Sequence, residues 1–336
     1  MMTLWRWALG IGRLARRRRV PMRDTRRDIP TPLRGANAQR PTSKAEPSLR
    51  LTAPARQLAC AMLPQRDSIL SLLADEDSDT AALVQSQLIA RGPDTLADLR
   101  ELLPEANGRA ERRLKETIAQ IAGEAAEQKF GKLCANFPED GDIEDAAWTL
   151  SSVVAPGEDF DDLRAQLDQW GSTLSRKLLG KDTVIQQCNT MAAFLGSELG
   201  FRGNEDDYYA EENSLLPRVI EGRRGNPITL CLIYIFVGRR AGLPILGVGL
   251  PGHFVVRVGG VFLDPFHAGR RLQLEDCQKL LESQGLDLQP HHLLPCKPRV
   301  MLARMLNNLL HAAETGDPRL GEKLHGWLQV LQRATV

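Results

Sequence analysis

The sequence predicts an α+β protein, with a small antiparallel sheet between an all-helical N-terminal region and a helical C-terminal tail. Apolar residues recur at helical spacing from 66 to 200, with charged residues between them. After Gly242 the pattern changes to three short runs of β-branched and aromatic residues that glycines separate. Helical spacing then returns near the end of the chain, on both sides of a turn at "TGDP".

The first 50 residues differ in composition from the rest of the chain. They contain thirteen Arg or Lys against three acidic residues, whereas the whole chain has a net charge of +1. The body is therefore acidic, which gives no reason to expect nucleic-acid binding. An Arg-rich, acid-poor start fits a transit peptide or an amphipathic anchor, but a disordered tail is the simpler interpretation. We expect residues 1–60 to be a disordered basic segment.

The six cysteines are scattered, without CxxC or Cys/His metal spacing. In a chain of 336 residues this pattern indicates reduced thiols in a cytoplasmic protein. No apolar run approaches the ~18 residues that a bilayer span needs. His291 and His292 lie near Cys296 in the sequence, but no second pair of Cys or His residues follows at the spacing of a metal site. The sequence therefore predicts no membrane span, no metal and no cofactor.

Residues 61–180 are expected to form the helical region. Three short apolar-periodic segments are separated by "ADEDSD" and "RGPD", and a long amphipathic segment follows them. This rhythm is similar to a HEAT-type repeat, in which short antiparallel helices stack. A plain helical bundle explains the pattern equally well, so both arrangements stay open.

The stretch "NPITLCLIYIFVGRRAG" predicts a buried central helix. Asn226 is a suitable N-cap and Pro227 suits the first helical position. The segment is apolar nearly all round, which is typical of a helix inside a domain. Arg239 and Arg240 fall in the last turn, and Gly242 is placed to end the helix.

The stretch "HFVVRVGGVFLDPF" predicts a β-hairpin with a two-glycine loop at 259–260. If Val258 pairs with Val261, side-chain alternation places His253 and Asp264 on one face of the sheet. The two residues are then diagonal neighbours about 7–8 Å apart at the backbone. The carboxylate can therefore orient the imidazole, as a general base in a nucleophilic site requires.

Several motifs in this half of the chain resemble the transglutaminase-like core of the bacterial SirB family. "GNPITLCLIY", "GLPILGVGLPGHFVVR" and "LDPF" follow one another with the spacing of that family, and the likeness covers roughly 185–315. The resemblance implies a papain-like α+β core at 181–290 and a tetratricopeptide-like helical tail at 291–336. It also implies that His253 is a catalytic base and that Asp264 orients it.

The nucleophile departs from this pattern. Enzymes of the superfamily carry a cysteine at the start of the central helix, where the helix dipole lowers the thiol pKa. Pro227 occupies that position, and Cys231 lies one helical turn further on. Cys231 is the candidate nucleophile, although a buried cysteine acting as a small hydrophobe is the commoner case.

Several further residues are weaker candidates. Asn213 and either Tyr208 or Tyr209 are expected to line a substrate or partner cleft, with capping or packing as an equal alternative. Thr229 is expected to line the same cleft, and it is a weaker candidate nucleophile than Cys231 because a hydroxyl needs stronger activation than a thiol. His267 directly follows "LDPF", but a solvent-facing turn histidine is the commoner case.

Two functions follow from these residues. The first is a degenerate, non-catalytic transglutaminase-like module that binds a protein or peptide partner and has a regulatory role. The second is a cysteine hydrolase or acyltransferase with Cys231, His253 and Asp264 as its catalytic residues. Because the usual nucleophile position holds Pro227, the sequence favours the first.

Overall fold

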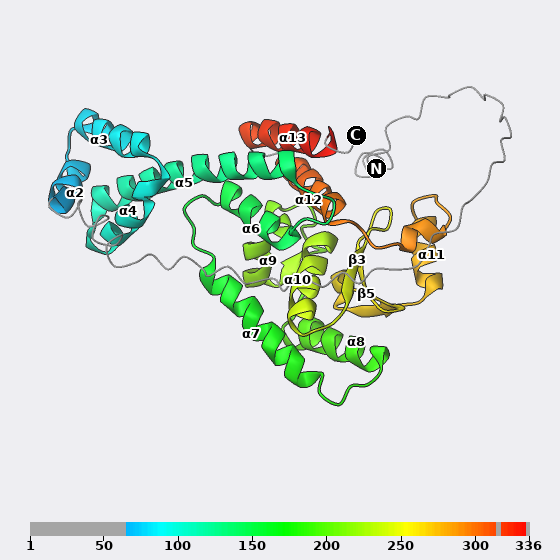
Figure 1. Ribbon diagram of the computed structural model, residues 1–336. Helices are drawn as coiled ribbons and strands as arrows, with labels where there is room; N and C mark the ends of the chain where they lie inside the picture. Colours follow the sequence, from blue (N-terminus) through cyan, green and yellow to red (C-terminus); the bar gives the residue numbers. More distant parts are fainter. Residues whose placement is uncertain (1–64, 314–316, 334–336) are drawn as a thin grey trace, which may run out of the picture.

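The computed structural model describes residues 65–313 and 317–333 (Figure 1). The predicted disordered segment at 1–60 lies outside these residues. The predicted α+β class is confirmed, since helices precede and follow one small sheet. The α-helices of the described residues are α2 (Arg66–Ala74), α3 (Ser78–Arg91), α4 (Leu96–Leu102), α5 (Gly108–Asn136), α6 (Ile143–Val154), α7 (Asp161–Lys177), α8 (Val184–Ala192), α9 (Leu216–Gly222), α10 (Pro227–Arg240), α11 (Leu274–Glu282), α12 (Pro298–Ala313) and α13 (Pro318–Arg333).

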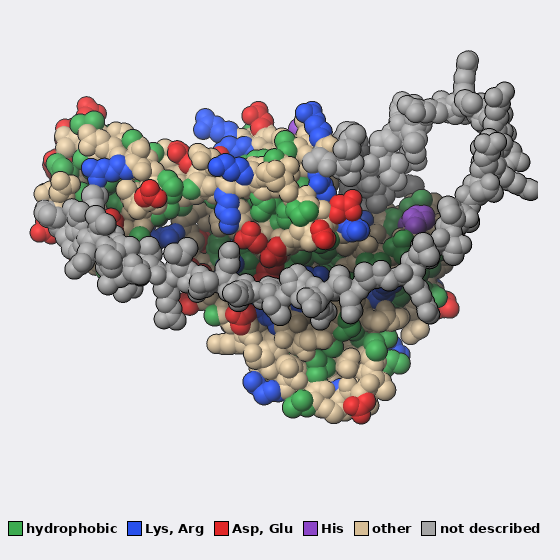
Figure 2. Space-filling model, in the orientation of Figure 1, with side chains coloured by type: hydrophobic (Ala, Val, Ile, Leu, Met, Phe, Trp, Pro, Cys, Tyr) green, Lys and Arg blue, Asp and Glu red, His purple; other side chains and the backbone are tan. Residues whose placement is uncertain are grey.

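Helices α2, α3 and α4 form a separate lobe on the first half of α5, at the left of Figure 1. Figure 2 shows this lobe projecting from the rest of the described surface, with basic and acidic side chains interspersed on the visible face. Asp77 caps α3, and Gly92 ends it with a φ of 76°. The lobe has its own apolar core, made by Leu73, Leu88, Leu99, Leu102, Ala110, Leu114, Ile118 and Ile121. The HEAT-type arrangement of these helices stays a prediction.

The second half of α5 belongs to a larger core. From Ala126 onward its apolar face packs with α6 and α13, and α12 packs in turn on those two helices. Figure 1 shows α13 lying along this end of α5, so the C-terminal tail is joined to the N-terminal region. The ring of Trp327 meets that of Phe130 edge-on at 5.1 Å. One continuous helix therefore contributes to two apolar cores.

Helix α10 lies at the centre of the larger core, as predicted. Every residue from Pro227 to Gly238 is buried, because the helix is apolar on all sides. The Asn226 side chain accepts a hydrogen bond from the backbone N–H of Thr229 and so caps the helix. Gly242 follows with a φ of 84°, a backbone conformation that glycine adopts without a steric penalty.

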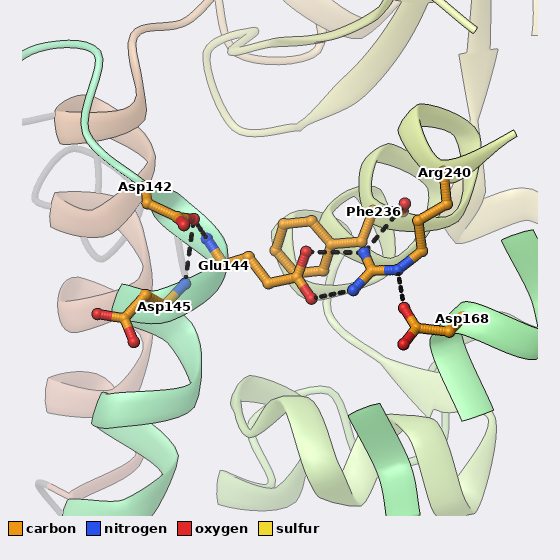
Figure 3. Close-up of polar contacts among 6 residues, drawn as sticks. All are labelled: Asp142, Glu144, Asp145, Asp168, Phe236 and Arg240. Carbon is orange, nitrogen blue, oxygen red and sulfur yellow. Dashed lines mark hydrogen bonds and ion pairs between the residues drawn. The ribbon is translucent and has the colours of Figure 1, made fainter. Parts of the chain in front are cut away.

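Arg240, at the end of α10, joins three helices (Figure 3). Its guanidinium donates to both carboxylate oxygens of Glu144 in α6, at 2.8 and 2.7 Å, and to Asp168 in α7 at 2.6 Å. Helix α7 comes close enough that a Cβ on Gly171 would lie 2.3 Å from the Cβ of Arg240. Helices α6 and α7 thus share a core with α10. The predicted domain limits of 61–180, 181–290 and 291–336 stay a prediction.

The sheet is antiparallel, in the order β3-β4-β5-β6. Val258 pairs with Val261 across the loop at 259–260, so the predicted hairpin register is confirmed. Val256 and Leu263 face the larger core, whereas Val255 and Phe262 belong to a small cluster with α11. A separate parallel pair joins β1 and β2. The strands are β1 (Arg202–Gly203), β2 (Arg224–Gly225), β3 (Ile245–Val248), β4 (Val255–Val258), β5 (Val261–Asp264) and β6 (Arg270–Leu272).

None of the helices among the described residues combines the length and the apolar character that crossing a membrane requires.

Candidate functional site

Asp264 is the last residue of β5 and also begins the turn that follows. Pro265 has no N–H for a further β-ladder and suits the first position of a short helix. A 3₁₀ turn, η6 (Pro265–His267), therefore starts here. Oδ1 of Asp264 accepts a hydrogen bond from Phe266 N at 3.1 Å, which fixes the carboxylate. The Asp264 side chain is completely buried.

His253 lies in the loop between β3 and β4, and a partly buried arginine holds this loop in place. Nη1 of Arg304 in α12 donates to the carbonyl oxygens of Leu250 and His253, at 3.2 and 3.1 Å. The Arg304 guanidinium also lies over the ring of Phe254, 5.5 Å from its centroid. The C-terminal tail thus positions the backbone of the candidate base.

Two histidines converge on the Asp264 carboxylate. Nε2 of His253 lies 3.0 Å from Oδ1, and Nδ1 of His267 lies 2.7 Å from Oδ2. The first approach is close, but it is poorly aligned for an N–H···O bond: Nε2 of His253 has no hydrogen-bond partner among the described residues. The His253 side chain is 10% exposed and that of His267 is 44% exposed. The structure thus forms a His-Asp-His cluster that is open to solvent on the His267 side.

The carboxylate of Asp264 is stabilised in its charged form. Burial by itself raises a carboxyl pKa, because the charged form loses its hydration. The contacts with His253 and, to a smaller degree, His267 outweigh burial and hold the pKa of Asp264 below its usual value. Asp264 is therefore an anion beneath two imidazoles.

Cys231 lies on the side of α10 that meets β4. Its Sγ donates to the carbonyl oxygen of Phe254 at 3.3 Å, next to His253 in the chain. The thiol is completely buried. Burial, reinforced by the negative charge of Asp264, raises the pKa of Cys231 well above the ordinary thiol value. The surroundings therefore favour the neutral thiol over the thiolate that nucleophilic attack needs.

Tyr234 lies on α10 one turn after Cys231 and is also completely buried. Its hydroxyl has no hydrogen-bond partner in the described part of the chain. Burial raises the pKa of Tyr234, and the negative charge of Asp264 acts in the same direction. A Cβ on Gly269 would lie 2.9 Å from this hydroxyl. The tyrosine thus places an unpaired polar group beside the turn that carries Asp264.

The three residues that the sequence placed in a cleft have different surroundings. Asn213 is buried, and its amide donates to the carbonyl oxygens of Asp207 and Tyr208, at 2.6 and 3.1 Å. Thr229 is buried, and its hydroxyl donates to the cap residue Asn226 at 3.0 Å. Tyr209 is 58% exposed. These contacts organise the acidic loop and the start of α10; a cleft role for all three stays a proposal.

Close backbone contacts hold the turn after Asp264. A Cβ on Gly203 would lie 2.4 Å from the ring of Phe266, and one on Gly196 would lie 2.0 Å from the carbonyl oxygen of Ala268. Gly196 lies in a π-helical turn, η4 (Ala193–Glu198), which is a local distortion often found beside functional sites. Glycines on two neighbouring elements thus allow this turn to pack closely.

Two residues of this region were missed or undervalued by the sequence argument. The sequence left His267 as a possible contributor, with a solvent-facing turn residue as the commoner case; the side chain is 44% exposed and also contacts Asp264. The signal was its position three residues after Asp264 across a proline, because a 3₁₀ turn brings positions i and i+3 together. Arg304 had no such signal, since it lies 51 residues after His253.

The comparison with family models supports the fold. Residues 161–307 match the model of the Transglutaminase-like superfamily. The matched range contains α10, the sheet and the first part of α12. No solved structure matches the chain.

Curated relatives match a similar length of the chain. A UPF0162 protein of Xylella fastidiosa is 40% identical over 126 residues, which cover 34% of this chain and 45% of the relative. A UPF0162 protein of Pseudomonas aeruginosa is 37% identical over 129 residues, 36% of this chain and 47% of the relative. Mouse F-box only protein 21 is 30% identical over 128 residues, 34% of this chain and 20% of that protein.

The alignments thus span about half the length of the UPF0162 relatives and about a fifth of F-box only protein 21. Together with the family-model match and the central helix packed on a small antiparallel sheet, they support a transglutaminase-like family for this part of the chain.

Proposed function

We propose that this protein is a cytoplasmic, SirB-type transglutaminase-like protein that is non-catalytic and binds a protein or peptide partner in a regulatory role. The proposal concerns the whole chain, whereas the family match covers residues 161–307.

The burial of Cys231 is the observation that carries the proposal. The thiol hydrogen-bonds to the Phe254 carbonyl, and the protein raises its pKa well above the ordinary value. An active cysteine needs the opposite: partial exposure and a lowered pKa. A substrate carbonyl would also have to enter a core in which every residue from Pro227 to Gly238 is buried.

The start of α10 supports the same conclusion. In catalytic relatives of this fold the thiol is expected at the helix N-terminus, and here that position is Pro227. The neighbouring hydroxyl of Thr229 is buried and donates to Asn226, so it serves the cap.

The relatives support a protein or peptide as the partner. The stretch shared with F-box only protein 21 is only about a fifth of that protein, which supports use of the fold as one module among others. The helical lobe of α2–α4 and the tail helices α12 and α13 supply further surfaces for a protein partner.

A cysteine hydrolase or acyltransferase is the second candidate, and the contact between His253 and Asp264 favours it. In that reaction Cys231 would attack an amide carbonyl after His253 takes its proton. His253 would then protonate the leaving group, Asp264 would orient the imidazole, and backbone N–H groups would stabilise the oxyanion. This route requires the buried thiol to become accessible.

Labelling with a thiol-reactive amide-mimic probe at neutral pH distinguishes the two candidates. The wild-type chain, Cys231→Ala and His253→Ala are compared, with Cys296→Ser as a control for a thiol that is less buried. We expect the labelling of the wild type to be unchanged in Cys231→Ala and in His253→Ala. Labelling of Cys231 that His253→Ala abolishes would overturn the non-catalytic proposal.

A further inference from the structure

The His-Asp-His cluster has the composition of a metal site, although the sequence predicted none. His253, Asp264 and His267 each offer one ligand atom, and these atoms lie within 4.8 Å of one another. They come from three local segments: the loop before β4, the end of β5 and the turn η6. Two imidazoles and one carboxylate form a donor set that suits Zn²⁺ and other divalent first-row ions.

One buried polar atom of the cluster and one beside it are unpaired among the described residues. Nε2 of His253 is buried and makes no aligned hydrogen bond within the described ranges. The Tyr234 hydroxyl, also fully buried, has no partner there either. Unpaired buried polar atoms are rare in folded proteins, so the unpaired ring nitrogen points to a ligand at this position. A cation would accept the lone pair of Nε2 and balance the charge of Asp264.

The surroundings suit a metal site in two further ways. His267 is 44% exposed, whereas His253 is 10% exposed and Asp264 is fully buried, so an ion can enter past His267. The backbone that carries the ligands is already held, by Arg304 on the His253 carbonyl and by the packing of Gly203 against Phe266. Such outer contacts orient metal ligands and strengthen binding.

We propose that His253, Asp264 and His267 bind one divalent transition-metal ion, with Zn²⁺ as the probe. Three protein ligands leave a position free for water or for a side chain of the partner. The inference goes beyond the protein-binding proposal and does not depend on it. Loss of metal binding would leave the probe-labelling result unchanged, so the two proposals fail separately.

Metal titration of the full-length chain tests this site. Zn²⁺ binding is measured by calorimetry, and Co²⁺ is used for its visible absorption, which responds to the ligand set. The wild-type chain is compared with His267→Ala, His253→Ala and Asp264→Asn. The double variant His291→Ala/His292→Ala is the matched control, because these adjacent histidines, with ring centroids 4.1 Å apart, form a histidine pair outside the cluster.

We expect one equivalent to bind to the wild type and to the double variant, and the affinity of His267→Ala to fall by at least about tenfold. His267 is partly exposed, so this variant keeps the test valid if His253→Ala or Asp264→Asn does not fold; circular dichroism checks each fold. Equal binding by the wild type and His267→Ala, no binding by the wild type, or loss of binding only in the double variant would each overturn the proposal.

Discussion

Asp264 organises its surroundings at the scale of a single residue. Its two carboxylate oxygens contact His253, His267 and the backbone N–H of Phe266. A buried carboxylate is costly unless charged or polar groups compensate it, and these contacts hold its pKa below the usual value despite burial. The contacts of Asp264 therefore depend on its charge.

Replacing that charge tests the dependence. Asp264→Asn keeps the shape of the side chain but removes the charge that both imidazoles face. We expect the free energy of unfolding to fall by about 1–3 kcal/mol, the usual cost of leaving buried polar groups poorly paired. Urea denaturation at neutral pH, in the presence of a metal chelator, measures this. Asp287→Asn, at an exposed position, should stay within about 0.5 kcal/mol of the wild type.

Helix α10 connects the elements of the larger core. Its apolar surface packs against α7 on one side and against the sheet on the other. Arg240 at its end then joins it to α6 and α7 through Glu144 and Asp168 (Figure 3). The side chains of Arg240 and Glu144 are only 26% and 23% exposed, so this pair is better shielded from water than a surface ion pair.

Removing the guanidinium should loosen the three-helix junction. Arg240→Ala is expected to lower the free energy of unfolding by about 1–3 kcal/mol, because bidentate bonds between charged groups are lost. The matched control is Arg239→Ala, an exposed arginine in the same helical turn. Thermal and urea denaturation of both variants compare them directly. An equal decrease in the free energy of unfolding of the two variants would show that the ion pairs of Arg240 contribute nothing beyond the effect of a positive charge at the helix end.

At the scale of the whole molecule, α5 joins two apolar cores. The lobe core ends at Ile121 and the larger core begins at Ala126 on the same helix. Regions with separate cores open with separate free energies, even when one helix connects them. We therefore expect the α2–α4 lobe to unfold locally while the transglutaminase-like core stays folded.

Hydrogen exchange can detect this separation. Leu99 is 1% exposed in the lobe core, and Leu99→Ala should cost about 2–5 kcal/mol of local stability. Amides in 66–102 should then exchange faster, while those of α10 keep their protection. Leu306 is a fully buried leucine in the larger core. Leu306→Ala should therefore speed exchange in α10 and leave the exchange of amides in 66–102 unchanged. Faster exchange in α10 of Leu99→Ala would show that the two cores unfold as one unit.

Local signals in the sequence determined the central helix, the hairpin and, through them, the α+β fold class. Asn226 and Pro227 mark the start of α10 because capping and φ restriction act within one helical turn. The two glycines at 259–260 set the register that pairs Val258 with Val261, because a two-residue loop allows only one pairing of the residues on either side of it. That register brings His253 and Asp264 together, as the sequence indicated.

Tertiary packing decided what surrounds that pair. Burial of the Cys231 thiol depends on how α10 packs against the sheet, and the position of Arg304 depends on the return of α12 to the His253 loop. Neither effect leaves a periodic or local pattern in the chain, because both arise from contacts between residues far apart in sequence. Local rules therefore determined which groups could form the site, whereas packing decided their exposure and charge state.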